Sequence, residues 1–222
     1  MPRMLRPWML LSTLSALMLG ACQAADPVAI VPADGAQASA QLSRRPRGPV
    51  ALNVDSILVA ELARIAARQD AEQEIYDSLK VIWQQVLDDT TGRYADSLMC
   101  DPKQYVGTAK IVGPEGDDID FGEHKLRIPA GALPVRTVIT AEAPTSLRVT
   151  SVFSPHGTRF NPSAKPTLEL SYKHCRAPNR PARIAYVGAN GEILEWPPSQ
   201  DFRDQEYVRG IIDHFSNYIV AY

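Results

Sequence analysis

The feature that most constrains the fold is a set of short runs in which apolar and polar residues alternate, all of them beyond Lys103. Each run is rich in β-branched and aromatic residues, and turn residues separate them. The runs are residues 125–129, 136–143, 147–154, 167–172, 182–188, 192–196, 207–213 and 215–222. Strands of this length without a helical pattern between them indicate an antiparallel β-sandwich or barrel. Asn190–Gly191, between two runs, predicts a two-residue hairpin turn.

A helical pattern precedes the strands, in residues 54–92. Asp55 or Ser56 can cap the start of a helix. Apolar residues then recur every three or four positions; they are Ile57, Leu58, Leu62, Ile65, Ile75, Leu79, Ile82, Trp83 and Val86. Polar residues interrupt this stripe, so it predicts either one long helix or two helices with a break near Arg68–Ala71. The stripe fits packing on the following domain or pairing with another chain.

The first 21 residues have the layout of an export signal. Arg3 and Arg6 are the only charged residues among them, and an almost wholly apolar stretch runs from Trp8 to Leu19. This stretch is shorter than the roughly 20 residues that a membrane-spanning helix needs. We therefore predict a signal peptide over residues 1–21 rather than a retained transmembrane anchor.

The signal ends in Leu19-Gly20-Ala21-Cys22, which resembles the lipobox of bacterial lipoproteins. The resemblance implies that Cys22 receives a diacylglyceryl thioether, that the chain is cut before it, and that the new amine is acylated, for example with palmitate. Two or more acyl chains anchor a protein stably where one does not. Gln23, in place of Asp, favours the outer membrane over the inner one. The alternative is a secreted protein in which Cys22 has no role.

The segment from residue 22 to residue 53 is predicted to be a disordered tether. It has no aromatic residue and is rich in alanine and proline, so it buries too little apolar surface to offset the entropy of ordering. The exported chain carries 21 Lys+Arg (23 minus Arg3 and Arg6) against 25 Asp+Glu, a net charge of −4. This balance argues against a nucleic-acid partner, because such proteins concentrate basic residues on one face.

Two cysteines remain beyond Cys22, namely Cys100 and Cys175. An exported protein meets an oxidising compartment, where an even pair of cysteines favours a disulfide. The alternative is a pair of buried thiols.

Three segments carry a resemblance to a known family. They are residues 111–133, IVGPEGDDIDFGEHKLRIPAGAL; residues 153–172, FSPHGTRFNPSAKPTLELSY; and residues 214–222, HFSNYIVAY. Together they resemble the ZU-type domain of zonula occludens proteins, netrin receptors and ankyrins, and look most like bacterial lipoproteins with such a domain. The resemblance covers about half of the chain. It implies an antiparallel β-sandwich, here residues 100–222, and a role in protein contacts.

The triplet His214-Phe215-Ser216 is the sharpest candidate for chemistry. Some relatives of the ZU family cut themselves between Phe and Ser of such a triplet. The resemblance implies that the Ser216 hydroxyl would attack the Phe215 carbonyl while His214 assists proton transfer. The structural alternative, which we favour, makes His214 a cap of the turn, Phe215 a core residue and Ser216 a local hydrogen-bonding group.

Other residues give no firm sign of a metal or cofactor. The histidines His124, His156, His174 and His214 lie at no spacing typical of metal ligands. The acidic run Glu115, Asp117, Asp118 and Asp120 is expected to be a solvated hairpin tip rather than a calcium loop. We therefore expect no cofactor and no metal.

The whole pattern predicts a mainly β protein with an N-terminal α segment, in which one or two helices precede an antiparallel β-sandwich. We expect a lipid-anchored protein of the bacterial cell envelope, of structural or protein-interaction type and not an enzyme. It would meet the membrane through the lipid on Cys22 and bind a protein partner that the sequence does not identify. The alternatives are self-processing at Phe215–Ser216 and a carbohydrate-binding module with aligned exposed aromatic residues.

Overall fold

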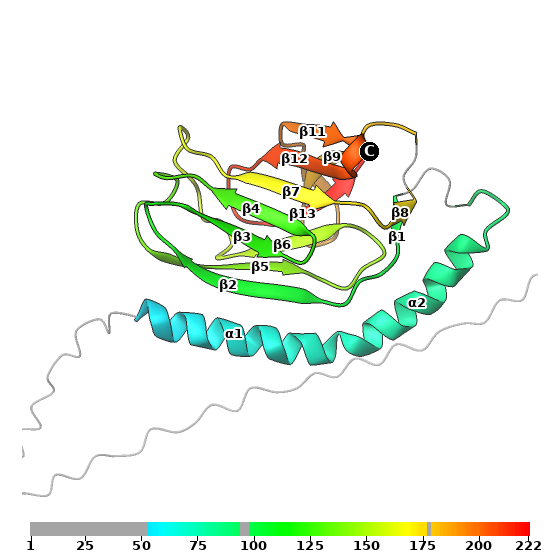
Figure 1. Cartoon of the computed structure of the whole chain (residues 1–222), viewed down its shortest axis with the longest axis horizontal. Coiled ribbons are helices and arrows are strands. Elements are labelled where there is room, and N and C mark those ends of the chain that lie inside the picture. The colour runs from blue at the N-terminus through cyan, green and yellow to red at the C-terminus, as the bar shows by residue number, and fades with distance from the viewer. Residues whose placement is uncertain (1–52, 94–97, 177–178) are drawn as a thin grey trace, which may run out of the picture. The chain divides into compact units, whose positions relative to one another are not determined.

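The structure is a computed structural model that describes residues 53–93, 98–176 and 179–222 (Figure 1). These residues lie within one compact unit, Gly48–Tyr222. Two helices come first, α1 (Val54–Ala71) and α2 (Gln73–Leu87). The strands are β1 (Met99–Cys100), β2 (Val106–Val112), β3 (Asp117–Phe121), β4 (His124–Ile128), β5 (Thr137–Ala143), β6 (Thr150–Ser154), β7 (Thr167–Ser171), β8 (Cys175–Arg176), β9 (Arg183–Val187), β10 (Ile193–Glu195), β11 (Ser199–Phe202), β12 (Tyr207–Ile211) and β13 (Asn217–Ala221).

The described strands form two main antiparallel sheets with a shared core. One has the order β10-β9-β13-β6-β5-β2 and the other β11-β12-β7-β4-β3, while β1 and β8 make a small separate pair. Apolar side chains from both sheets meet between them, among them the fully buried Phe121, Phe153 and Leu168. The predicted fold class, mainly β with an N-terminal α segment, is confirmed.

The large aromatic residues of the sandwich divide into two groups. Phe160, Tyr172, Phe215 and Tyr218 are buried, whereas Tyr186 and Trp196 are only half-buried. The Arg183 guanidinium lies over the Trp196 ring, 4.7 Å from its centroid, so that ring packs at the surface of the sheet.

Every predicted run contains a strand, but two local predictions need correction. The acidic segment is not a hairpin tip, because Asp117–Phe121 forms β3 and pairs with β4. The Asp117 and Asp118 carboxylates instead pair with cations of neighbouring strands, Lys110 at 2.7 Å and Lys125 at 3.8 Å. The hydrogen bond from Lys110 lowers the pKa of Asp117.

The hairpin between β9 and β10 is present, with a longer loop than predicted. The Gly191 N–H donates to the Gly188 carbonyl, and the Gly188 N–H donates to the Glu192 carbonyl. Gly191 has φ +80°, the left-handed conformation that glycine adopts without strain. This is a three-residue hairpin loop, a turn followed by one left-handed residue, instead of the two-residue turn.

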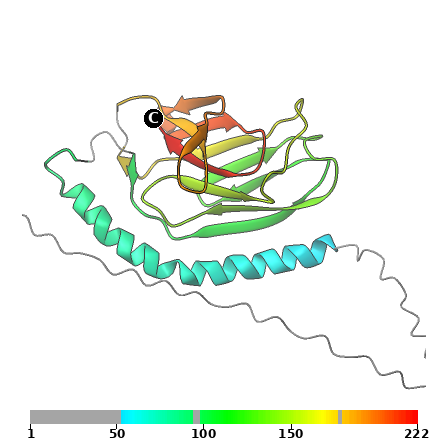
Figure 2. The same cartoon turned by 180° about the vertical axis from the view of Figure 1, so that it is seen from behind.

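The helical segment contains two helices, with the break at Glu72. The cap of α1 is Asn53, whose side chain accepts a hydrogen bond from the Asp55 N–H, and not Asp55 or Ser56. Figures 1 and 2 both show α1 running beside β2, and α1 also contacts β5. α1 therefore packs on the domain that follows it.

The predicted apolar stripe contributes little to this packing. Within the described part of the two helices, Ile65 and Val86 are its buried members, while Leu62, Ile75 and Ile82 are exposed. No described helix is long and apolar enough to span a membrane.

The disulfide between Cys100 and Cys175 is confirmed. The two cysteines lie directly opposite each other in the β1–β8 pair, so the bond ties together two segments that are 75 residues apart in the sequence.

Candidate functional site

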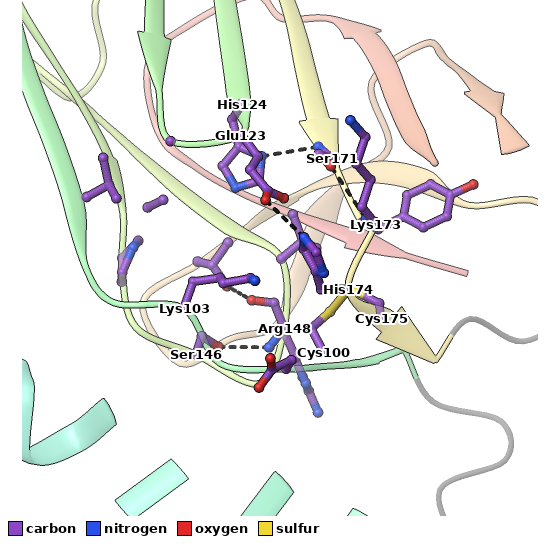
Figure 3. Close-up of a pocket in the computed structure, with 18 of the residues that line it drawn as sticks. Cys100, Lys103, Glu123, His124, Ser146, Arg148, Ser171, Lys173, His174 and Cys175 are labelled. Carbon is purple, nitrogen blue, oxygen red and sulfur yellow. Dashed lines mark hydrogen bonds and ion pairs between the residues drawn. A yellow bond between two sulfur atoms is a disulfide. The ribbon is translucent and has the colours of Figure 1, made fainter. Parts of the chain in front are cut away.

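A pocket of about 300 Å³ opens at the end of the sandwich beside the disulfide (Figure 3). The start of β2, the β3–β4 turn, the β5–β6 connection and the end of β7 surround it. This volume is at the lower limit for a small-molecule site in a protein. Its lining residues include Cys100, Lys103, Val106, Glu123, His124, Ala143, Pro144, Arg148, Val149, Ser171, Tyr172, Lys173, His174 and Cys175.

The pocket has apolar walls. Val106, Ala143, Pro144 and Val149 contribute aliphatic surface, and the disulfide of Cys100 and Cys175 adds sulfur. Apolar surface of this kind favours a ligand that has an apolar body, because both surfaces leave water on binding.

The charged rim of the pocket carries an excess of positive charge. The two acidic residues are already paired, Asp101 with Lys80 at 2.8 Å and Glu123 with the His174 ring at 3.0 Å. Among the described residues, no carboxylate forms an ion pair with Lys103, Arg148 or Lys173 of the pocket lining.

These three cations differ in direction. In Figure 3 the Lys103 ammonium points toward the middle of the pocket, whereas the charged ends of Arg148 and Lys173 point away from it on opposite sides. Lys103 is therefore the cation placed to contact a bound ligand, and the other two raise the positive potential around the opening.

His124 supplies a neutral hydrogen-bond donor on the wall of the pocket. The Ser171 backbone N–H donates to His124 Nδ1 at 3.1 Å, so the neutral ring carries its proton on Nε2. Burial lowers the pKa of His124 to about 4, which keeps the ring neutral at pH 7. The ring also packs against Phe121 at 5.3 Å between centroids, at the end of the core.

The sequence did not indicate this pocket. His124 looked like an ordinary residue at a strand end, and Lys103, Arg148 and Lys173 belong to three separate segments. Only the pairing of the strands brings these residues together.

The triplet His214-Phe215-Ser216 lies at the start of the last strand. The Phe215 side chain is fully buried, 4.8 Å from the Phe160 ring and 5.7 Å from the Phe153 ring between centroids. The Phe215 carbonyl accepts a hydrogen bond from the Gly157 N–H at 3.0 Å.

The two side chains that self-cleavage would require, His214 and Ser216, are not hydrogen-bonded to each other. The His214 ring packs edge-on against Tyr186, 4.9 Å between centroids, and within the described residues no hydrogen bond links it to the Ser216 hydroxyl. Ser216 is buried, and its carbonyl accepts from the Phe153 N–H. The triplet thus lacks the hydrogen bond that joins a nucleophile to its base, and cleavage stays the alternative to the uncleaved chain that we expect.

A buried carboxylate holds α1 against the outer face of the sheet. Glu142 in β5 has a side chain only 3% exposed, and it accepts hydrogen bonds from the guanidinium groups of Arg64 and Arg68. The two arginines are four residues apart and so share one face of the helix. The hydrogen bond to Glu142 raises the pKa of Arg64.

The break between the helices belongs to the same contact. Glu72 is buried there and accepts hydrogen bonds from the Thr145 N–H at 2.7 Å and from Arg68 Nε at 2.9 Å. Thr140 in β5 donates to Glu61 of α1 at 3.3 Å. Polar groups, more than the apolar stripe, therefore attach α1 to the sheet.

Gly107 in β2 allows the helix to approach this closely. A Cβ atom there would lie 2.8 Å from Ile65 Cγ2 of α1 and 2.5 Å from the Tyr105 hydroxyl oxygen. A larger residue would push the helix away from the sheet.

α2 keeps apolar side chains in contact with solvent. Ile75 and Ile82, two turns apart on one side of the helix, are 48% and 39% exposed. Lys80 pairs with Asp101, and Arg176 donates to the Val86 carbonyl, so α2 is held beside the sandwich by polar contacts.

Cys22, the predicted lipidation site, lies outside the described residues, as do the predicted signal peptide and nearly all of the predicted tether. Among the described residues, no group of three or more His, Cys, Asp or Glu side chains is arranged to hold a metal ion. No protein-family model matches the chain, and no curated protein sequence matches it. The resemblance to ZU-type domains therefore stays an expectation.

Proposed function

We propose that the protein is a lipid-anchored component of the bacterial cell envelope, of structural or protein-interaction type and without catalytic activity. The observation that carries this proposal is the Leu-Gly-Ala-Cys run that ends at Cys22, directly behind an apolar stretch with two arginines before it. A thioether-linked diacylglycerol and an acylated amine would anchor the protein stably. The outer membrane is favoured where the cell has one.

The helical segment supports the interaction part of the proposal. The Glu142 contact and the break at Glu72 attach α1 to the sandwich, and α2 continues from it with Ile75 and Ile82 exposed. Exposed apolar side chains that lie together on a surface often mark a protein contact. A partner would meet them on a helix that the sandwich already positions.

Fractionation of cells tests the anchor. The wild-type chain is expected in the membrane and in the detergent phase, and Cys22→Ser is expected to lose both maturation and membrane association. An unchanged distribution of Cys22→Ser would refute the anchor.

Site-specific photo-crosslinking in native envelopes tests the partner. A photoreactive amino acid at Ile75 is expected to give one discrete adduct, whereas the same group at Ile211, which is 45% exposed in β12, should give none. Ile82→Ser should abolish the Ile75 adduct. Equal adducts at both positions, or an adduct that survives Ile82→Ser, would contradict an interaction through α2.

A further inference from the structure

The pocket beside the disulfide combines three features that nothing in the proposed function uses. It has aliphatic walls formed by Val106, Ala143, Pro144 and Val149. The Lys103 ammonium points into it. The His124 ring, neutral and hydrogen-bonded through Nδ1, presents its second nitrogen toward the same space (Figure 3).

Each feature restricts the ligand. The apolar walls disfavour a small inorganic ion, because such an ion would lose water of hydration on entry and the walls offer nothing to replace it. The ammonium and the imidazole N–H are both donors and favour an acceptor with negative charge. Neither acidic residue of the rim forms an ion pair with Lys103, since Asp101 pairs with Lys80 and Glu123 forms a hydrogen bond with the His174 ring.

The volume of the pocket limits the size of the ligand. At about 30 Å³ for each non-hydrogen atom, the volume that one water occupies in the liquid, a pocket of about 300 Å³ holds about ten such atoms. This is the size of an eight-carbon carboxylate, or of one apolar amino-acid residue with its terminal carboxylate, and far smaller than a folded protein.

We propose that this pocket binds a small amphipathic carboxylate of about ten non-hydrogen atoms, whose carboxylate group lies between Lys103 and His124 Nε2. The same chemistry is found in a free aliphatic acid and in the apolar C-terminus of a peptide. The proposal goes beyond the proposed function and does not depend on the lipid anchor.

Titration of the full chain carrying Cys22→Ser, so that no attached lipid competes, tests the proposal by NMR. Sodium octanoate is expected to bind saturably with a Kd below about 1 mM and to shift the amide signals of Glu123, Ser171 and Lys173. Octan-1-ol and octylammonium, which keep the tail and change the head, should bind at least tenfold more weakly. Acetate, which lacks the tail, should also bind at least tenfold more weakly.

Two variants locate the carboxylate. Lys103→Gln is expected to weaken octanoate binding at least tenfold, because it removes a charge-assisted hydrogen bond. Lys165→Gln is the matched control, since that lysine pairs with Asp213 and is not part of the pocket lining; it should bind octanoate as the wild type does.

A pair of acetylated amino acids separates the two sources of the ligand. Acetyl-leucine with a free carboxylate should bind, and its C-terminal amide should not. Tighter binding of acetyl-leucine than of octanoate would identify a peptide C-terminus as the source, and the reverse order would identify a free acid.

Three results would overturn the proposal. They are equal binding of octan-1-ol and octanoate, shifts confined to residues outside the pocket, and unchanged octanoate affinity in Lys103→Gln. None of these results would affect the test of the anchor at Cys22, so the two proposals can fail separately.

Discussion

Glu142→Gln should release α1 from the sandwich without unfolding the domain. The substitution keeps the size of the side chain but removes the charge that pairs with Arg64 and Arg68. It also places an amide N–H₂ opposite a guanidinium group, where two donors face each other. The contact therefore changes from attractive to partly repulsive.

The structure sets the size of this effect. Breaking a fully buried ion pair costs about 3–5 kcal/mol. Here the side chains of Arg64 and Arg68 are 42% and 37% exposed, so water replaces part of the interaction with Glu142 that the substitution removes. We therefore expect the free energy of opening of α1 to fall by about 2 kcal/mol, which corresponds to roughly thirtyfold faster amide exchange.

Hydrogen exchange followed by mass spectrometry measures this directly. Peptides from α1 should exchange about thirtyfold faster in Glu142→Gln, whereas peptides from β7 and β12 should keep their protection. Glu169→Gln is the matched control, because Glu169 also binds two arginines, Arg127 and Arg209, but on the other sheet. Unchanged exchange of α1 in Glu142→Gln, or equal acceleration in Glu169→Gln, would show that the Glu142 contact does not hold α1 on the sheet.

Three further predictions concern the disulfide, the buried histidine and the triplet. The double variant Cys100→Ser/Cys175→Ser should lower the free energy of unfolding by up to about 4 kcal/mol, because the bond closes a loop of 75 residues, as measured by chemical denaturation. The pKa of His124 is about 4 in the folded state and about 6.5 when unfolded. The unfolded chain therefore takes up a proton first as the pH falls from 6.5 to 4, and the free energy of unfolding should be lower by about 2 kcal/mol at pH 5. His124→Asn, which keeps an acceptor for the Ser171 N–H, should remove this part of the pH dependence. The purified chain and Ser216→Ala should both give a single uncleaved mass.

Each of these three predictions has a result that would contradict it. An unchanged denaturation midpoint in the double variant would show that the disulfide does not stabilise the fold. An identical loss of stability at pH 5 in His124→Asn would assign the pH dependence to other groups. A fragment lighter by Ser216–Tyr222, present in the wild type and absent in Ser216→Ala, would establish cleavage.

The alternating pattern predicted the sandwich because burial on one face of a strand leaves a period of two in the sequence. Val208 and Gly210 are buried and Arg209 between them is not, as the pattern requires. The pattern is lost in β5, where residues on both faces are buried because α1 covers the outer one. The run 136–143 could therefore be assigned as a strand, but its contact with a helix could not be predicted.

The conformation of the connections between elements was only partly predictable. Gly191 marked the hairpin, but whether one or two residues precede it in the loop depends on how β9 and β10 align. The break at Glu72 was visible as a polar interruption of the stripe. That Glu72 is buried and bonded to the Thr145 N–H could not be seen, because the partner is 73 residues away.

The pocket is beyond what one sequence reveals. Lys103 and His124 have no periodic or motif signal, and their proximity depends on the pairing of strands far apart in the chain. The disulfide was predictable from the export signal together with the even pair of cysteines, but its place on the wall of a pocket was not.

The most direct test of the account is mass spectrometry of the N-terminal peptide of the mature protein, isolated from bacterial envelopes. We predict that this peptide begins at Cys22 and carries a diacylglyceryl group on sulfur and an acyl chain on the amine. A mature peptide that begins before Cys22, or one that begins there without lipid, would contradict the account.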